Sequence, residues 1–332
     1  MRPRRLRGDR LTEADVVGRV LTHDLGRHLR KGTVLGPEHL DMLRVVPEIH
    51  VVELEPGDVH EDEAARRLGA AIAGPGTEGG EPRQSQVRLT AAHRGLVRVE
   101  REAVERMNHL PAVSVFTLVD GQAVDDGEEV AGAKVTPVAV PSTVLDQAAT
   151  IASIRPVVQV KAFCSLRTKV VVTERLKPRA RELFAMAVTR KLGWFGARLL
   201  PVREVERSGD SVRHAYQEAG REGAELVLFA GASSIDPLDP AYAELEAAGG
   251  ELLRQGVPAH PGSMLWLGRL ADATVLGVAS CAGFGKNTAL DLLLPFVFAY
   301  GEAREEDFQH LGYGGLIEAG AGRRFPPYRE GD

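Results

Sequence analysis

From residue 157 onward, apolar runs alternate with helical stretches, and this alternation constrains the fold more than any other feature of the chain. Helical patterns at about residues 178–192 and 211–220 accompany four apolar runs, which read VVQVKAF, KVVVT, ARLLPV and AELVLFAG. Strands that alternate with helices of about ten or more residues are typical of parallel βαβ units. The run AELVLF is continuously apolar, as expected for a strand buried on both faces. We therefore predict an α/β fold, a three-layer sandwich with a mostly parallel sheet.

The same rhythm continues toward the end of the chain. A helical pattern at about residues 240–254 leads to the runs SMLWLGRL and ATVLGVAS, and a last helix is predicted at about residues 288–300. Residues 305–332 are rich in glycine and charge and show no clear period. We predict an α/β domain over residues 151–304, followed by a tail over 305–332.

The first half of the chain has a different character. Residues 1–73 indicate a small mixed α+β unit that ends in a helix at about residues 59–72, with Asp58 as its N-cap and Glu61 completing a capping box. His60 fits a capped and solvated helix start, and a ligand contact near it stays open. The stretch GPGTEGGEPRQ predicts a flexible linker over residues 74–86. Residues 87–150 indicate a small β-rich unit, with a helix-like stretch AHRGLVRVEREAVERMNHL before its strands.

Composition narrows the functional classes. The 332 residues carry 46 acidic and 41 basic side chains, a net charge of -5, which argues against a general nucleic-acid surface. The basic start MRPRRLRGDR is not followed by the apolar core of a signal peptide, and no run approaches a membrane span, so we expect a cytoplasmic protein. Two cysteines are too few for a disulfide framework.

Ligands of open parallel sheets lie beyond the carboxyl ends of the strands, which directs attention to the loops that leave those ends. One such loop is AGASSIDPLD, directly after AELVLF. Its small residues allow backbone N–H groups to approach an anion, and Ser233 and Ser234 add hydroxyl donors. Asp236 and Asp239 are either helix caps or acceptors for a polar ligand such as a pterin ring. A purely structural turn remains an equal alternative.

A second loop, ASCAGFGKNTALDLLLP, follows ATVLGV and also opens a helix. Gly283, Gly285 and Lys286 are similar to the end of a phosphate loop, but Ser280 and Asn287 replace residues that a Walker-type motif requires. We therefore exclude a Walker-type nucleoside triphosphatase. A looser anion site remains, with the Lys286 ammonium as a point charge and the N–H groups of residues 286–288 as donors.

These loops and the segment between them carry a family resemblance. The order VLFAGASSIDPLD, a helix, VPAHPGSMLWLGRLADATVLGVAS, a glycine-containing loop and TALDLLLPFVFAYG resembles the C-terminal domain of the molybdopterin molybdenumtransferase and gephyrin family. The segment HPGSMLWLGRL is most similar to that family's Pro-Gly-Lys-Pro segment and the strand after it. The resemblance spans about residues 157–303, and the N-terminal stretches GRVLTHDL and LRKGTVLGPEHLDML resemble the start of the family more loosely.

The chain departs from the family pattern in three loops. The family's double glycine is Ala230-Gly231, the lysine after Pro-Gly is Ser263, and the Pro-Gly-Asn-Pro loop is replaced by residues 279–286. Where the family has Thr-Gly-Asp-Glu-Leu, this chain matches the threonine with Thr173 but lacks the glycine and the aspartate. Binding of a molybdopterin-type ligand survives such changes more easily than metal-insertion chemistry does.

The resemblance implies a protein that binds molybdopterin or the molybdenum cofactor in cofactor biosynthesis. If it is an enzyme, it would be a transferase that inserts molybdenum or acts on the pterin phosphate, with Asp236 and Asp239 as catalytic residues that hold a divalent ion such as Mg²⁺. The alternative is a non-catalytic carrier that delivers the cofactor to a molybdenum hydroxylase. A homo-oligomer is expected from the family. The predicted ligand-binding residues are Thr173, Gly231, Ser233, Ser234, His260, Gly262, Ser263, Gly283, Gly285, Lys286 and Thr288.

Overall fold

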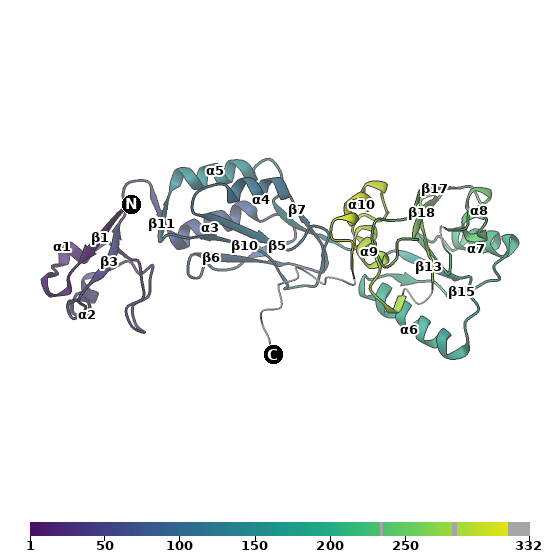
Figure 1. The fold of residues 1–332 in the computed structure, drawn as a ribbon, viewed down its shortest axis with the longest axis horizontal. Helices are drawn as coiled ribbons and strands as arrows, with labels where there is room; N and C mark the ends of the chain where they lie inside the picture. The colour runs from purple at the N-terminus through teal and green to yellow at the C-terminus, as the bar shows by residue number, and fades with distance from the viewer. Residues whose placement is uncertain (233–234, 281–283, 318–332) are drawn as a thin grey trace. The chain divides into compact units, whose positions relative to one another are not determined.

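The computed structural model describes residues 1–232, 235–280 and 284–317. The chain divides into two compact units, unit 1 (Met1–Ala162) and unit 2 (Phe163–Asp332) (Figure 1). The two units have separate hydrophobic cores. Within the described ranges, no helix combines the length and the apolar character needed to cross a membrane. The finer boundaries expected near residues 74, 87, 151 and 305 stay predictions.

Unit 1 begins with a three-stranded antiparallel sheet in the order β1-β3-β2. The elements of this part are β1 (Arg2–Leu6), α1 (Glu13–Val16), β2 (Val20–Leu21), α2 (Leu40–Arg44) and β3 (Ile49–Glu53), with 3-10 turns at Gly8–Arg10 and Pro37–His39. Leu21, Leu35, Leu43 and Ile49 form the centre of a small core. This part therefore folds around apolar side chains that its short strands and helices supply together.

The rest of unit 1 is built on a four-stranded antiparallel sheet in the order β5-β6-β10-β8. Three helices share one hydrophobic core with this sheet. The helices are α3 (Glu61–Ile72), α4 (Arg101–Asn108) and α5 (Ser142–Ala152), and the strands are β5 (Thr77–Gly79), β6 (Gln86–Ala91), β8 (Val113–Thr117) and β10 (Glu129–Val135). Two smaller sheets, β12-β7-β9 and β11-β4, complete it with β4 (Asp58–His60), β7 (Gly95–Val99), β9 (Ala123–Val124), β11 (Ala139–Pro141) and β12 (Val158–Ala162).

Two expectations for unit 1 were wrong in detail. Residues 95–99, predicted within a helix-like stretch, form β7, because their backbone pairs with that of β12, and only residues 101–108 of the stretch are helical. The helix expected from about residue 59 begins at Glu61, because residues 58–60 pair with β11. Pairing with a distant strand decided both cases.

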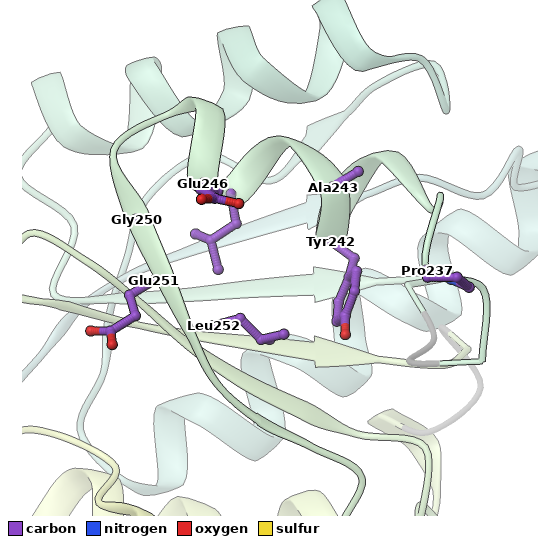
Figure 2. A pocket seen from close by; sticks show the side chains of 8 residues that line it. Pro237, Tyr242, Ala243, Glu246, Gly250, Glu251 and Leu252 are labelled. Carbon is purple, nitrogen blue, oxygen red and sulfur yellow. The ribbon is translucent and has the colours of Figure 1, made fainter.

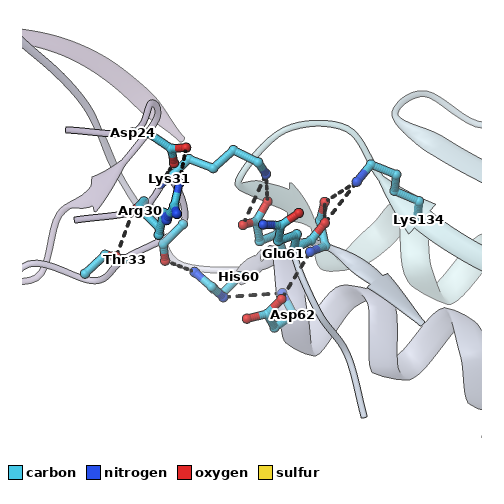
Figure 3. Close-up of polar contacts among 11 residues, drawn as sticks. Asp24, Arg30, Lys31, Thr33, His60, Glu61, Asp62 and Lys134 are labelled. Atoms are coloured by element: carbon cyan, nitrogen blue, oxygen red, sulfur yellow. Dashed lines mark hydrogen bonds and ion pairs between the residues drawn. The ribbon is translucent and has the colours of Figure 1, made fainter. Parts of the chain in front are cut away.

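His60, and not Asp58, is the N-cap of α3 (Figure 3). Its Nδ1 accepts a hydrogen bond from the Asp62 N–H at 3.4 Å, and its Nε2 lies 2.7 Å from the Gly32 carbonyl oxygen. Glu61 is 2% exposed, and its carboxylate lies 3.0 Å from the Lys31 ammonium. Both ring nitrogens of His60 thus have protein partners, which favours the structural interpretation of this residue over a ligand contact.

Unit 2 contains a seven-stranded sheet in the order β14-β13-β16-β19-β18-β17, with β15 also paired to β13. Pairs among β13, β14, β15, β16 and β19 are parallel, whereas β18 is antiparallel to both of its neighbours. The strands are β13 (Arg167–Val172), β14 (Arg198–Leu199), β15 (Arg203–Glu204), β16 (Leu226–Ala230), β17 (Gly250–Gln255), β18 (Trp266–Leu270) and β19 (Ala273–Val278). The predicted α/β class and mostly parallel sheet are confirmed.

Five α-helices accompany this sheet in the described part of unit 2. They are α6 (Pro178–Trp194), α7 (Gly209–Arg221), α8 (Pro240–Ala247), α9 (Ala289–Tyr300) and α10 (Glu305–Gln309). One core joins α7 and α8 to alternate residues of the strands, among them Val171, Val227, Phe229 and Val275. The predicted last helix is confirmed as α9, with Thr288 as its N-cap.

The helix expected over residues 240–254 was wrong in its second half. It ends at Ala247, and residues 250–255 form the edge strand β17. Gly249 has a φ of +86°, and a Cβ on Gly250 would lie 2.5 Å from the Leu245 side chain. The two glycines turn the chain out of the helix, a breaker signal that the sequence itself contains.

Candidate site at the carboxyl edge of the sheet

Three parallel strands of unit 2 end at the same level. The register pairs Val172 with Ala230 and Ala230 with Val278, so the loops after β13, β16 and β19 start side by side. We call this the carboxyl edge. Parallel strands bring their carboxyl ends to one edge of a sheet, and ligands of such folds bind there.

Backbone hydrogen bonds hold the first residues of these loops together. The Thr173 N–H and hydroxyl both donate to the Ala230 carbonyl oxygen, at 3.0 and 3.3 Å. The N–H groups of Gly231 and Ala232 each donate to the Val278 carbonyl oxygen at 2.9 Å. Thr173 and Gly231, both predicted from the sequence, are therefore brought together at this edge.

Gly231 is required by its surroundings. Its φ is +91°, and a Cβ would lie 2.5 Å from Glu174 Cγ and 3.0 Å from Thr173 Oγ1. Only glycine combines this backbone conformation with so close an approach. The loop after β16 thus passes tightly over the end of β13.

The two aspartates of this loop have structural partners. Asp239 is 1% exposed and is the N-cap of α8, where its Oδ1 accepts a hydrogen bond from the Ala241 N–H at 2.9 Å. Its Oδ2 is paired with the Arg207 guanidinium. Asp236 is exposed, and its Oδ1 accepts from the Leu238 N–H at 2.9 Å.

Asp239 also affects a buried tyrosine nearby. The Tyr216 hydroxyl donates to the Ala241 carbonyl oxygen and is buried in the core under α7 and α8. Burial raises the pKa of Tyr216 well above its usual value, and the Asp239 charge adds to the increase. Among the described residues, no group of three or more histidine, cysteine, aspartate or glutamate side chains is arranged to hold a metal ion.

The segment with the best family match lies against the start of α9. The Pro261 carbonyl oxygen accepts a hydrogen bond from the Ala289 N–H at 2.8 Å. Gly262 has a φ of +108°, and a Cβ there would lie 2.7 Å from the Ala289 nitrogen. Thr288 is 7% exposed and caps the helix, and its own N–H donates to Asp291 at 2.8 Å. The Thr288 N–H, predicted as an anion donor, therefore has a partner within the chain.

His260 and Ser263 flank this contact differently. The His260 N–H donates to the Gly315 carbonyl oxygen at 2.7 Å, and its carbonyl oxygen accepts from the Ile317 N–H at 2.8 Å. The Ser263 side chain is exposed, while its carbonyl oxygen accepts from the Val257 N–H at 2.9 Å. Both residues are thus fixed through their backbone, and their side chains remain available.

Gly285 and Lys286 line a cavity of about 490 Å³ between α6 and the segment before α9. Trp194, Phe195 and Phe284 supply aromatic walls. The Lys191 ammonium donates to the Lys286 carbonyl oxygen at 2.9 Å and pairs with Asp291 at 2.8 Å. The α6 residues could not be predicted from the sequence, because a helix end carries no motif for a neighbouring cavity. Ser233, Ser234 and Gly283, also predicted for the site, lie outside the described residues.

A second cavity, of about 420 Å³, lies between α8 and β17. Figure 2 shows the Tyr242, Glu251 and Leu252 side chains around it. None of the predicted site residues lines this cavity. It lies at the edge of the sheet that β17 forms, and Pro237 from the loop after β16 also lines it.

Comparisons with known proteins gave matches among solved structures. No protein-family model matches the chain, and no curated protein matches it. The chain is similar to a protein of the molybdopterin biosynthesis class, the moea protein from Pyrococcus horikosii, with 15% identity, a TM-score of 0.32 and coverage of 73% of this chain and 80% of that one. It is also similar to MogA, with 18% identity, a TM-score of 0.29 and coverage of 42% of this chain and 96% of that one.

Proposed function

We propose that unit 2 binds a molybdopterin-type ligand at the carboxyl edge of its sheet and that the protein acts in molybdenum cofactor biosynthesis. The observation that carries this proposal is the convergence of the loops that resemble the family. Thr173 and Gly231 meet at the ends of β13 and β16, and the Pro261-Gly262 step meets the start of α9. Segments far apart in the sequence thus form one edge of the kind that binds ligands in open parallel sheets.

The chemistry of this edge suits a flat, anionic ligand. Gly231 and Gly262 let the backbone of their loops pack closely against Glu174 and Ala289 at this edge. Lys286 is exposed and supplies a positive charge in the loop that leads to α9, whereas Arg175 and Arg207 are paired with Glu206 and Asp239. The phosphate group of molybdopterin is anionic, so the charge of Lys286 favours its binding.

Several finer features are part of the same proposal. We propose a three-layer sandwich in which α6 and α9 lie on the face opposite α7 and α8. Thr274 and Val275 point to opposite faces of β19, and Val275 packs in the core with α7 and α8. The Thr274 hydroxyl accepts a hydrogen bond from the Ala303 N–H, just beyond α9, at 3.1 Å, in support of this arrangement. A cytoplasmic location, a homo-oligomeric state and Mg²⁺ binding by Asp236 and Asp239 are also predictions of this function.

A carrier without turnover is the second candidate function. Asp239 is engaged by the start of α8 and by Arg207, and Asp236 by its own turn. Carboxylates held in this way are poorly placed to exchange their partners for a metal ion or a reacting phosphate. This observation favours a protein that holds the cofactor and delivers it, for example to a molybdenum hydroxylase.

The first test is a fluorescence titration of the full chain with molybdopterin. We expect saturable binding at micromolar or lower concentration, and a loss of about tenfold in affinity for Lys286→Ala. Arg221→Ala, an exposed arginine at the far end of α7, is the matched control and should bind like the wild type. If the folded wild type does not bind, the proposal is wrong.

If it binds, a second measurement separates an enzyme from a carrier. An enzyme would turn over a nucleoside triphosphate in the presence of magnesium and bound molybdopterin, whereas a carrier would not.

A further inference from the structure

The outer face of α6 differs from those of the neighbouring helices. Of its 17 residues only Phe184, Val188 and Leu192 are buried. Leu183 is 58% exposed and Met186 is 68% exposed. Two large apolar side chains three positions apart lie on the same side of a helix, so they form one apolar surface.

Arginines flank this apolar surface on both sides. Arg179 lies four positions before Leu183, and Arg190 lies four positions after Met186, so all four residues share one face. Arg181 and Lys191, on other sides of α6, are paired with Glu204 and Asp291. Neither Arg179 nor Arg190 has an acidic partner within the described part of the chain. We call the four residues Arg179, Leu183, Met186 and Arg190 the α6 face.

The α6 face continues into the cavity at the end of the helix. Arg190 belongs to both, and Trp194 and Phe284 supply apolar walls beyond it. A cavity of about 490 Å³ is large enough for one bulky side chain. The surface therefore offers an apolar centre, an anchoring cavity and positive charge at each end.

We propose that the α6 face and this cavity form a docking surface for an acidic, amphipathic segment of a partner protein. Apolar side chains of the segment cover Leu183 and Met186, one of them enters the cavity, and carboxylates pair with Arg179 and Arg190. Helix-in-groove recognition uses such a spacing of apolar anchors. A second copy of this chain is a poor occupant, because pairing of two α6 faces in either orientation places arginines against arginines.

The test uses the full chain and a fluorescein-labelled synthetic helical peptide with two leucines three positions apart, flanked by glutamates. We expect saturable binding by fluorescence anisotropy. Two double variants test the two parts of the surface. One combines Leu183→Ser with Met186→Ser, the other combines Arg179→Glu with Arg190→Glu, and each should weaken binding at least about tenfold. Arg221→Glu on α7 is the charge-matched control, and peptides with serine for leucine or lysine for glutamate should not bind. Thermal unfolding of each variant verifies that the fold is retained.

Three outcomes would overturn the proposal. The first is no saturable binding of the acidic peptide, or equal binding by all variants. The second is an oligomer of the wild type that Leu183→Ser with Met186→Ser converts to monomers in sedimentation velocity, since the occupant would then be a second copy. The third is slow oxidation of Met186 by hydrogen peroxide in the monomeric full chain, which would show that another part of the same chain covers the face.

Discussion

At the scale of single residues, Asp239 is a position where a structural role and a functional role are alternatives. Its carboxylate is 1% exposed, caps α8 and pairs with Arg207. The sequence alone left a cap and a ligand acceptor as alternatives. Replacement of this side chain distinguishes the two roles, because they affect different measurements.

We predict that Asp239→Ala lowers the free energy of unfolding by about 1–2 kcal/mol, since it removes a helix N-cap. Asp239→Asn should lose less, because it keeps a side-chain oxygen that can accept the capping hydrogen bond from the Ala241 N–H. Urea unfolding followed by circular dichroism measures both. If Asp239→Ala unfolds like the wild type but loses about tenfold in molybdopterin affinity, the carboxylate acts on the ligand as the sequence predicted.

Lys169 provides a second prediction at this scale. It is 1% exposed in β13, and its ammonium lies 2.9 Å from Glu218 and 2.8 Å from Glu222. Burial opposes the charge of Lys169, but the hydrogen bonds to Glu222 and Glu218 outweigh it and raise its pKa above 10.5. The hydrogen bond from Lys169 lowers the pKa of Glu218 below 4.5.

The direction of these shifts sets the pH dependence. The lowered pKa of Glu218 contributes stability that is present above about pH 4.5 and is lost as the pH falls through the folded value. Glu218→Gln should therefore lower the free energy of unfolding by up to about 1 kcal/mol at pH 7, and the difference from the wild type should shrink at acidic pH. Urea unfolding at both pH values tests this. Glu246→Gln on α8, an exposed side chain, is the control, and a pH-independent difference for Glu218→Gln would contradict the prediction.

At the scale of elements, the contact between the Pro261-Gly262 step and the start of α9 places the family-like segment at the carboxyl edge. Gly262→Ala should disturb this contact, because its φ is +108° and the new Cβ would lie 2.7 Å from the Ala289 nitrogen. We predict a loss of about 1–3 kcal/mol in stability and weaker molybdopterin binding.

Gly220→Ala, near the end of α7, is the matched control for this prediction. Nothing lies within 4 Å of a Cβ at Gly220, so the change should neither lower the melting temperature nor alter the affinity. Thermal unfolding and the fluorescence titration measure the two effects. Wild-type behaviour of Gly262→Ala would show that the start of α9 does not depend on this step.

At the scale of the whole molecule, the two units have separate cores. We predict two calorimetric unfolding transitions for the full chain. Leu68→Ala, at a position 1% exposed in the unit 1 core, should lower one transition by several degrees, and Gly231→Ala should lower only the other. A single transition that both variants shift alike would mean that the units unfold as one.

Much of the local structure could be predicted from the sequence. The apolar period predicted α9, and the continuous run AELVLF predicted the buried strand β16. The prediction from the sequence was wrong where a strand pairs with a distant partner. The residues of β7 lie in a stretch with helical spacing, but they form a strand because they pair with β12. For β17, the Gly249-Gly250 step was present as a signal, and pairing with β18 completed the strand.

The sequence by itself determined the α/β alternation, the loops that follow the strands and the motifs in them, because these depend on the spacing of neighbouring residues. Only the tertiary structure decided which of these residues meet. It joined Asp239 to Arg207, Gly262 to the start of α9 and Lys191 to Lys286, pairs that lie far apart in the chain. Such contacts arise from the packing of helices and strands, and no local pattern of residues specifies them.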